Sequence, residues 1–445
     1  MASGASTADH NIRNFILFRV FFNARFYYPV FGVLFLDYGL TMSQLSMLNF
    51  VWAVAIVGLE VPSGAIADHF GRRPLLIAAS SFMVIEMLVI AFVPLGNPTL
   101  VFAAFMVNRV LSGAAEAAAS GADEALVYDS MVHENRGAEW PRVLERLGRW
   151  STFGFLFATL LGAFVYDAEL IHRAVQLIGL DLSPDPKTTM RFPVYLTLAN
   201  ALCALFITLR MKEAPRDVRT GTSISAAFVP IRRAFAWLLK SPLPLFLIAA
   251  GLLHDSIIRL IMTLATNYYR LVQIPTAWFG IIGALLGLSG FVMPSIGRWL
   301  VERRPIAFNF SLLAAITFVG LIGLTFGIPW YGVLFVALLG TVMRLVDFFL
   351  SSYLNAMIDS SERATILSFR GLAFNMGYGL VSVLFAGLLQ HLASVNATGA
   401  SQEMIFAASL HWLPWYFLLS LLPLASFARI SGCLRNISTV RDTGP

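Results

Sequence analysis

The sequence is poor in charged side chains: Asp, Glu, Lys and Arg together make up 13% of its 445 residues. A soluble chain of ordinary composition carries about a quarter charged residues. Hydrophobic residues instead make up 58%, and the mean hydropathy is +0.75. This composition excludes an ordinary soluble globular protein and predicts an integral membrane protein.

Cysteine is nearly absent, since the chain has only Cys203 and Cys433. Two cysteines give neither a disulfide framework nor the spacing of metal ligands. The sequence also has no nucleophile elbow, no His-Glu-x-x-His pattern and no P-loop. The net charge of +6 does not indicate nucleic acid, because the basic residues are spread over short loops. We therefore expect no enzyme activity, no cofactor, no resident metal ion and no nucleic-acid partner.

Long apolar runs are what the sequence has in abundance. We count twelve, each about long enough for a helix to cross the hydrocarbon core of a bilayer. The polar stretch 1–14 lacks the core of a signal peptide, and the run that follows it is long enough to span. The expected spans are roughly 15–36, 45–66, 75–95, 100–128, 148–166, 192–209, 243–266, 276–296, 306–326, 331–355, 366–390 and 408–428.

Basic residues are distributed unevenly between the two sides of these spans. An even number of spans puts both termini on one side, and most Lys and Arg fall in the segments of that side. The opposite loops hold only Arg173, Lys187, Arg191 and Arg270. Because cytoplasmic loops are enriched in Lys and Arg, we expect both termini in the cytoplasm. The protein is expected to be a multi-pass protein of the plasma (inner) membrane.

The two halves of the chain repeat faintly. Pro62, followed by Arg72 and Arg73, corresponds to Pro294, followed by Arg303 and Arg304. Parallel six-helix repeats are typical of transporters. We predict an all-α membrane protein with twelve transmembrane helices in two six-helix pseudo-symmetric bundles, at 1–209 and 243–428. A cytoplasmic linker at 210–242 and a cytoplasmic tail at 429–445 complete it. Within the linker, 224–239 is either an amphipathic helix on the membrane surface or a solvated connection.

Charged residues inside the apolar runs mark the candidate site. A charge in the bilayer is costly unless it is paired or wetted, so it indicates function by default. These charges are concentrated in the first, fourth, seventh and tenth runs, which implies that one helix in three lines a shared wet cavity. They include Arg25, Arg109, Glu116, Asp255, Arg259, Arg344 and Asp347.

Glu116 is the first candidate for a proton carrier, because it lies seven residues after Arg109 and so on the same helix face. A carboxyl in a dehydrated cavity has its pKa raised toward neutral. Asp255 is the second candidate, with His254 able to share its proton. Glu86, in the third run, is expected to be paired within its own half.

Arg25 is followed by Phe26, Tyr27 and Tyr28, a combination that can bind a carboxylate or phosphate and stack an aromatic substrate. The pairs Asp255–Arg259 and Arg344–Asp347 stand four and three residues apart. That spacing leaves two interpretations open. They are salt bridges within a helix that hold structure, or they are parts of the substrate cavity.

A charged, glycine-containing segment connects the second and third runs. Its defining residues are Gly64, Asp68, Gly71, Arg72 and Arg73. It resembles the cytoplasmic loop motif Gly-x-x-x-Asp-x-x-Gly-Arg-Arg of the major facilitator superfamily, with every defining position present. In the fourth run, an arginine followed four residues later by Gly113 resembles a further motif of that superfamily. The resemblance covers the whole chain through helix number, repeat and loop positions.

Finer features resemble bacterial members grouped with drug:proton antiporters, namely Glu60-Val-Pro-Ser and the segment 121–129. The proline-glycine signature of antiporters is absent from 149–167.

The loop motif implies a conformational latch. Asp68 would sit at the N-terminus of the eleventh helix, where unpaired N–H groups favour an anion, and Arg72 would bridge to Asp129. The alternative is an ordinary turn that obeys the positive-inside rule.

We therefore expect a secondary active transporter that works by alternating access. Proton-coupled efflux of amphipathic or drug-like compounds is the leading hypothesis. The alternatives are a proton-coupled carrier of an organic anion or other metabolite, a metal carrier that uses His254 and Asp255, and a non-transporting membrane sensor. The expected partners are a small-molecule substrate, protons and the lipid bilayer, and the chain is expected to act as a monomer.

Overall fold

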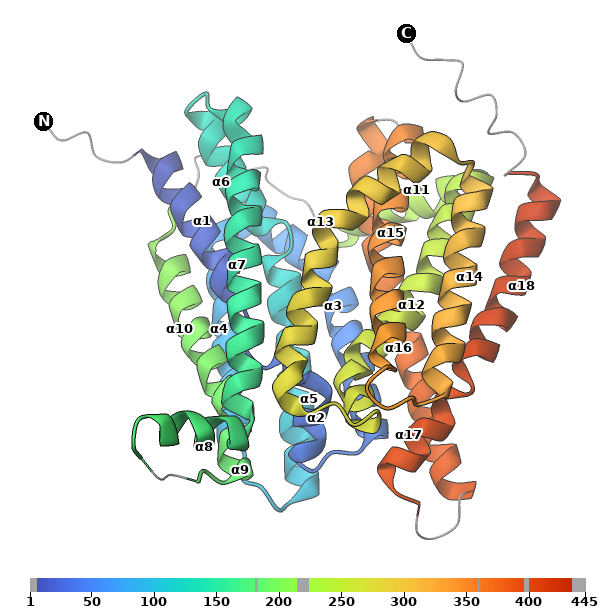
Figure 1. Ribbon diagram of the computed structural model, residues 1–445. Helices are drawn as coiled ribbons and strands as arrows, with labels where there is room; N and C mark the ends of the chain where they lie inside the picture. Colours follow the sequence, from blue (N-terminus) through green and yellow to red (C-terminus); the bar gives the residue numbers. More distant parts are fainter. Residues whose placement is uncertain (1–5, 181–182, 214–223, 359, 396–399, 434–445) are drawn as a thin grey trace, which may run out of the picture. The chain divides into compact units, whose positions relative to one another are not determined.

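The computed structural model describes residues 6–180, 183–213, 224–358, 360–395 and 400–433 (Figure 1). All regular structure in these ranges is helical. Contacts divide the chain into two units. Unit 1 comprises 1–40, 51–228 and 276–284, and unit 2 comprises 41–50, 229–275 and 285–445. Three of the five boundaries fall inside helices, namely α3 (Met42–Phe70), α11 (Ile224–Lys240) and α13 (Phe279–Arg303).

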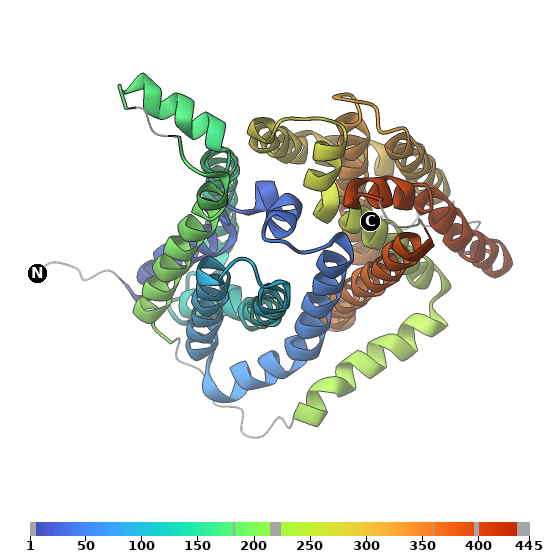
Figure 2. The same cartoon turned by 90° about the horizontal axis from the view of Figure 1, so that it is seen from below.

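Unit 1 contains most of the helices formed by the first six apolar runs, together with short 3-10 helices. Its elements are α1 (Thr7–Asn23), η1 (Tyr28–Val30), α2 (Phe31–Asp37), most of α3, α4 (Arg72–Phe92), α5 (Pro98–Ala119), α6 (Ala122–His133), η2 (Gly137–Glu139), α7 (Trp140–Tyr166), α8 (Ala168–Leu177), α9 (Pro186–Thr189), α10 (Phe192–Arg210) and η3 (Thr276–Trp278). α8 projects from the side of this unit (Figures 1 and 2).

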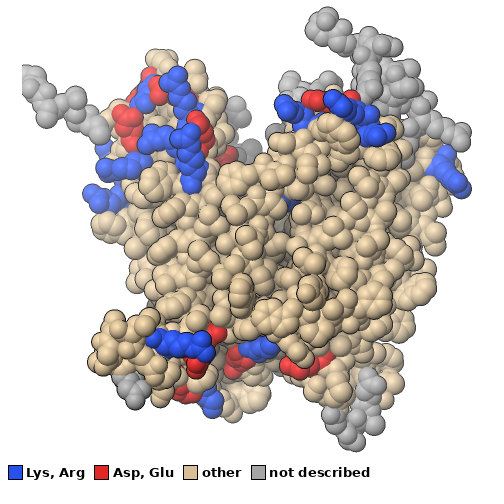
Figure 3. Space-filling model, viewed as in Figure 1, with Lys and Arg blue, Asp and Glu red and all other residues tan. Residues whose placement is uncertain are grey.

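Unit 2 contains most of α11 and α13 and the helices of the later runs. They are α12 (Pro242–Leu271), α14 (Ile306–Thr325), α15 (Val333–Met357), α16 (Ser360–Val395), α17 (Gln402–Leu410) and α18 (Leu413–Ser431). The segment 224–239, for which two interpretations were open, lies in the helix α11. On the face shown in Figure 3, charged side chains gather near the helix ends and leave a broad belt almost free of charge.

Eleven candidate membrane spans are found among the described residues, in close agreement with the twelve expected. The missing one is the first. The prediction of a continuous helix over 15–36 is wrong, because α1 ends at Asn23 and regular helix resumes only at η1 and α2.

Side chains of α10 explain how this interruption is tolerated. Thr197 Oγ1 accepts a hydrogen bond from the Phe26 N–H at 3.0 Å, and Asn200 Nδ2 donates to the Ala24 carbonyl at 2.7 Å. Non-helical backbone at membrane depth requires such partners, because lipid offers none. Gly162 of α7 lies against the same segment, where a Cβ would collide with the Phe26 carbonyl.

The prediction of one continuous helix over 100–128 is also wrong. α5 ends at Ala119, and α6 begins at Ala122 after Gly121, which has the left-handed φ of +72°. A glycine adopts this conformation without the steric cost that a Cβ brings. Arg109 and Glu116 both lie on α5, before this break, and can therefore share one helix face as expected.

Small side chains bring the helices of unit 1 close together. Its core contains Ala79, Ala115, Ala118, Ala201 and Ala204, all nearly or fully buried. A Cβ on Gly113 of α5 would lie 2.7 Å from the Ala55 Cβ and 2.9 Å from the Trp52 carbonyl oxygen of α3. Close approach of this kind is the usual basis of helix association where lipid removes the hydrophobic driving force.

Candidate functional site

The interruption between α1 and α2 carries Arg25, the central charge of unit 1. Its side chain is buried, with the whole residue 2% exposed. Nη1 lies 2.7 Å from Glu86 Oε1 of α4, and Nη2 lies 3.2 Å from Glu116 Oε1 of α5. One cation is thus held between two carboxylates from different helices. The expected pairing of Glu86 within its own half is confirmed.

Neutral groups complete the surroundings of Arg25. Nη1 also donates to the hydroxyls of Tyr27 at 3.3 Å and Ser112 at 3.4 Å. The guanidinium lies 5.6 Å from the ring centre of Phe22 and 5.8 Å from that of Tyr28. A buried ion cluster is stabilised when its remaining hydrogen-bonding groups are satisfied. Those of Arg25 are largely satisfied, whereas Glu86 Oε2 is buried without a hydrogen-bond partner among the described residues. Arg25 was expected to bind substrate. In this structure its guanidinium is instead bound by groups of the protein.

The two carboxylates differ in their access to solvent. The Glu86 side chain is 0% exposed, whereas that of Glu116 is 31% exposed. A buried carboxylate beside a fixed cation keeps its partner, because separating the two would leave an uncompensated charge. Glu116 is thus the partly exposed carboxylate of the cluster, and Glu86 is the buried one.

Arg109 does not pair with Glu116, although the two share a stripe in the sequence. Its Nε and Nη2 donate to Asn108 Oδ1 at 3.1 and 3.0 Å. The guanidinium also lies over the rings of Phe31 and Phe35 of α2, at 5.2 and 5.3 Å. Among the residues that the structure describes, no carboxylate forms an ion pair with Arg109. Aromatic faces and a side-chain amide hold this cation instead.

The loop motif forms a compact ionic corner at one end of unit 1. The predicted ion pair between Arg72 and Asp129 is present. The carboxylate of Glu213 accepts hydrogen bonds from the backbone N–H groups of Arg72 at 2.9 Å and Arg73 at 2.8 Å. An anion at the N-terminus of a helix is stabilised by these unpaired donors and by the helix dipole.

Two glycines of the motif differ in their surroundings. Gly71 has the positive φ of +111°, and a Cβ there would lie 3.0 Å from the Glu213 carboxylate. Gly64, in contrast, has nothing within 4 Å of an added Cβ, so close helix packing does not require a glycine at this position. The side chain of Asp68 lies outside the described residues, as do the first side chains of α16. The proposed contact between Asp68 and that helix therefore stays a prediction.

In unit 2 the central charges are a local pair on α12. Asp255 and Arg259 form the expected ion pair one helical turn apart, at 2.7 Å. Arg259 Nη1 also donates to Asn375 Oδ1 of α16 at 2.9 Å, and its guanidinium lies 5.4 Å from the ring centre of Tyr378. The Asp255 side chain is 4% exposed and that of Arg259 is 25% exposed.

The expected pair on α15 is not formed. Arg344 Nε donates to Ser289 Oγ of α13 at 2.8 Å, and Nη2 lies 3.5 Å from the Leu286 carbonyl oxygen. No ion pair joins Arg344 to Asp347, both of which the structure describes. Both residues are exposed on this helix. A spacing of three residues permits a salt bridge but does not enforce one, because competing neutral acceptors lie on α13.

His254 is fully buried, and the structure does not join it to Asp255. Its Nδ1 lies 2.7 Å from the Ala250 carbonyl oxygen, and its ring packs edge-on against Phe417 of α18 at 5.4 Å. Neighbouring residues on a helix point about 100° apart, so they do not face each other. The described residues contain no group of three or more His, Cys, Asp or Glu that could hold a metal ion.

Three features of the site were not predicted from the sequence. Arg19 pairs with Asp123 at 2.7 Å and with Glu124 at 2.9 Å, joining α1 to α6. Glu213 caps α4, and polar side chains of α10 support the interrupted backbone. Thr197 and Asn200 carried a detectable signal, because hydrogen-bonding side chains inside an apolar run usually have a partner.

Comparison with known proteins supports the fold and the family. The sequence profile described as Major Facilitator Superfamily matches residues 14–382. No curated protein matches the sequence. Several solved structures of transporters do match the fold, at low sequence identity.

The nucleoside transporter NupG has a TM-score of 0.67 and 14% identity, covering 95% of this chain and 99% of its own. A bacterial homologue of the human lysosomal transporter Spinster has a TM-score of 0.66 and 13% identity, over 96% and 97% of the two chains. A D-xylose–proton symporter has a TM-score of 0.62 and 14% identity, over 92% and 96%. At such identities these structures show the fold alone. Since the profile spans most of its length, the chain belongs to the major facilitator superfamily, and it is a secondary transporter of small molecules rather than an enzyme.

Proposed function

We propose that this transporter is coupled to protons and exports amphipathic compounds in exchange for them. The observation that carries the proposal is the Arg25 cluster, in which a partly exposed Glu116 shares one buried cation with a fully buried Glu86. When Glu116 is ionised, the three charged groups sum to one negative charge. When Glu116 is protonated, the charges of Arg25 and Glu86 cancel and the cluster is neutral.

This difference supplies a physical route to coupling. Loss of the charge on Glu116 weakens its contact with Arg25, which is carried by the interrupted backbone between α1 and α2. A ligand shifts a conformational equilibrium only by its differential affinity for the two states. Glu116 therefore couples protons to transport if its exposure to water, and so its proton affinity, changes between them.

The aromatic side chains beside the cluster favour an amphipathic substrate. Tyr28 is 42% exposed, and its ring packs against Tyr27 and Phe31 with ring centres 5.2 and 6.5 Å apart. Exposed aromatic faces next to a charged group suit a ligand with an apolar body and a polar end. Export rather than import follows from the resemblance of 121–129 to antiporters and is part of the proposal.

A second candidate, transport of an organic anion, is favoured by Arg344. This exposed guanidinium has neutral partners among the described residues, Ser289 and a backbone carbonyl. A planar guanidinium with free donors is suited to bind a carboxylate. Arg344 and Asp347 are the residues that we would assign to the substrate cavity in this case.

A binding screen followed by a transport assay separates the two candidates. Purified protein is tested by thermal shift with amphipathic amines, dyes and organic acids, because specific binding stabilises the native state. Compounds that bind are then tested in proteoliposomes with an imposed pH gradient. The proposal predicts gradient-driven movement of an amphipathic compound. Stabilisation and movement of organic acids alone would support the second candidate. Transport of any compound that ignores the pH gradient would overturn proton coupling.

We also propose that the Arg72–Asp129 pair, together with Asp68, latches one end of unit 1 during the transport cycle. Asp68→Asn keeps the size of the side chain and removes its charge. Transport should fall sharply at near-normal expression, and accessibility probes should report an end that opens more readily. Unchanged transport in Asp68→Asn would reduce the motif to a turn.

The proposed orientation has both termini in the cytoplasm. A cysteine introduced beside Lys187 should react with an impermeant reagent applied to intact cells, whereas one at Arg232 should react only after permeabilisation. The native Cys203 and Cys433 are first replaced. The reverse labelling pattern would invert the orientation and with it the side assigned to the latch.

A further inference from the structure

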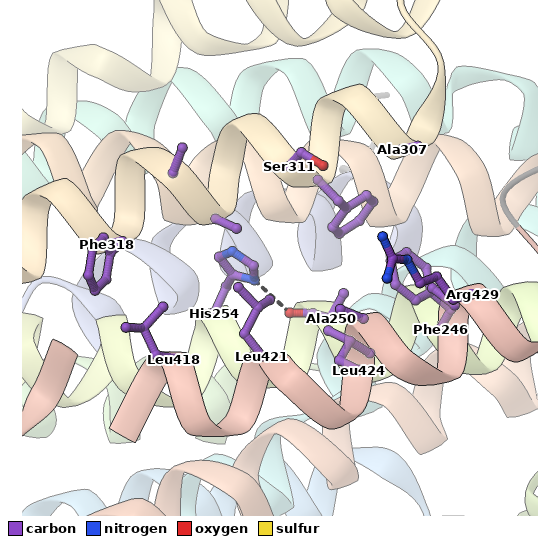
Figure 4. A pocket seen from close by; sticks show the side chains of 15 residues that line it. Phe246, Ala250, His254, Ala307, Ser311, Phe318, Leu418, Leu421, Leu424 and Arg429 are labelled. Atoms are coloured by element: carbon purple, nitrogen blue, oxygen red, sulfur yellow. Dashed lines mark hydrogen bonds between the residues drawn. The ribbon is translucent and has the colours of Figure 1, made fainter. Parts of the chain in front are cut away.

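Unit 2 contains a cavity that the proposed transport mechanism does not use. It lies between α12, α14 and α18 and has a volume of about 650 Å³ (Figure 4). Its walls are mostly apolar, and small residues from all three helices leave the space open, among them Ala250, Ala314 and Ala425. A volume of this size accommodates one drug-sized molecule.

Three polar side chains line the cavity among the described residues, His254, Ser311 and Arg429. Of these His254 is the most deeply buried, with 1% of the residue exposed. Its Nδ1 must carry a hydrogen, because it bonds to the Ala250 carbonyl oxygen, which only accepts. In the neutral ring Nε2 is then an acceptor, and it has no hydrogen-bond partner among the described residues.

An unpaired acceptor of this kind identifies the ligand group that would satisfy it. A buried polar atom without a partner costs about 1–3 kcal/mol. A trapped water is well held only when two to four polar groups surround it, and this part of the cavity is apolar. The matching ligand group is an O–H or N–H donor placed inside an otherwise apolar molecule.

Arg429 lies at one end of the cavity, beside Phe246, and Phe318 and Leu418 lie at the other end (Figure 4). Phe246 and His254 are eight residues apart on α12, which corresponds to about 12 Å along the helix. A ligand that reaches both polar groups therefore carries an acid at one end, an apolar chain of roughly this length and a donor group beyond it.

The surroundings of the cavity indicate that this ligand enters from the lipid. Residues that follow lining positions on α14 and α18 are apolar and exposed, among them Val319 at 55%, Leu419 at 66% and Leu422 at 63%. Arg429 stands in the last turn of α18, where a basic side chain reaches the polar surface of the bilayer. An acidic group held at this depth is attracted to it.

The cavity faces away from the ion pair on the same helix. Asp255 and Arg259 contact α16 through Asn375, whereas the ring of His254 contacts α18 through Phe417. We propose that the cavity binds a single-chain hydroxylated carboxylic acid from the membrane. Its carboxylate is held by Arg429, its chain lies along the alanine-lined wall, and its hydroxyl donates to His254 Nε2.

The test uses the full chain in nanodiscs of neutral phospholipid and three probes, ω-hydroxylaurate, laurate and the methyl ester of ω-hydroxylaurate. Binding is measured by thermal shift over a concentration series. The proposal predicts that ω-hydroxylaurate binds about tenfold more tightly than laurate, as one additional hydrogen bond allows. The methyl ester, which has no carboxylate, should bind weakly. Equal binding of ω-hydroxylaurate and laurate would overturn the assignment of His254.

Variants assign the two ends of the ligand. His254→Leu should bind ω-hydroxylaurate as weakly as laurate, whereas Arg429→Gln should weaken both acids and leave the ester unchanged. The matched control is Arg304→Gln, which removes an arginine of unit 2 that stacks on Phe308 and does not line the cavity. If Arg304→Gln weakens the acids as much as Arg429→Gln, surface charge explains the binding and the site is refuted.

A variant that fills the cavity tests the site without changing the buried His254. Ala315→Phe places bulk on an exposed wall position, which should fold normally and abolish binding of both acids. Retained binding in Ala315→Phe would show that the acids bind elsewhere.

Addition of phosphatidylglycerol to the nanodiscs tests whether an anionic phospholipid occupies the cavity instead. The proposal predicts no displacement, and displacement of ω-hydroxylaurate would assign the cavity to anionic phospholipid instead.

Discussion

The two units hold their buried charges in different ways. In unit 1 Arg25 lies on an interrupted helix and binds carboxylates from two other helices. In unit 2 Asp255 and Arg259 lie on the continuous helix α12, one turn apart. The first arrangement exists only when three elements are correctly packed. The second is largely made by the helix itself.

This difference separates a charge cluster that can sense conformation from one that mainly holds structure. Any shift of α4 or α5 relative to the α1–α2 interruption changes the distances around Arg25. A shift of α12 carries Asp255 and Arg259 together and leaves their contact intact. We therefore place the coupling function in unit 1, and the following predictions compare matched positions in the two units.

Loss of Glu86 is expected to have the largest effect. Glu86→Gln removes the fully buried partner of Arg25, and breaking a buried ion pair costs about 3–5 kcal/mol. The thermal unfolding midpoint of the purified protein should fall strongly. Asp255→Asn is the matched change in unit 2, where Arg259 keeps Asn375 and some solvent, so its midpoint should fall less. Equal losses would remove the distinction between the two clusters.

Gly162→Ala tests the close approach of α7 to the interrupted backbone. The added methyl group collides with the Phe26 carbonyl, and overpacking of this kind costs about 1–3 kcal/mol. Transport should also fall, because the collision displaces the backbone next to Arg25. Gly387→Ala in α16 is the control, since nothing lies within 4 Å of its added Cβ. Normal stability and transport in Gly162→Ala would show that α1 and α2 can move away freely.

Thr197→Val tests whether a side chain supports the interruption. It removes the acceptor of the Phe26 N–H and leaves a buried donor unpaired, at a cost of about 1–3 kcal/mol. Thr317→Val is the control in unit 2, because the equally buried Thr317 hydroxyl donates to Leu313 within its own helix. The thermal midpoint of Thr197→Val should lie clearly below that of Thr317→Val. The opposite order would contradict the role of α10.

The smallest effect concerns acid stability at one end of unit 1. The hydrogen bond from Arg136 holds the pKa of Asp9 below its ordinary value of 3.8, and the Ala8 N–H holds the pKa of Glu134 below its ordinary value of 4.5. Because both folded pKa values are lowered, this stabilisation is present above the ordinary values. It is lost as pH falls through the lowered ones.

The measurement is the thermal midpoint between pH of about 5 and about 3, a range that covers ordinary carboxyl groups. The double variant Asp9→Asn, Glu134→Gln should lose less stability over this range than the unmodified chain. Glu145→Gln, whose carboxylate pairs with Arg149 one turn away, should behave like the unmodified chain. An identical acid response in the double variant would show that these contacts contribute nothing.

The sequence was sufficient to predict the fold class and most of the helices, because an apolar run in lipid satisfies its backbone by forming a helix. The breaks within 15–36 and 100–128 were not predicted. It also predicted contacts that depend on local spacing or on a recognised motif, such as Asp255–Arg259 and Arg72–Asp129. The partners of Arg25 could not be predicted, since they come from helices that only tertiary packing brings together. The failure of Arg344 to pair with Asp347 has the same cause.

The central claim is that Glu116 carries the proton, and the most direct test is transport by Glu116→Gln in proteoliposomes. Glutamine imitates the permanently protonated side chain. We predict that this variant loses transport driven by a pH gradient and keeps exchange of labelled for unlabelled substrate, whereas Asp255→Asn keeps most of both. Full gradient-driven transport in Glu116→Gln, together with its loss in Asp255→Asn, would contradict the account and place coupling on α12.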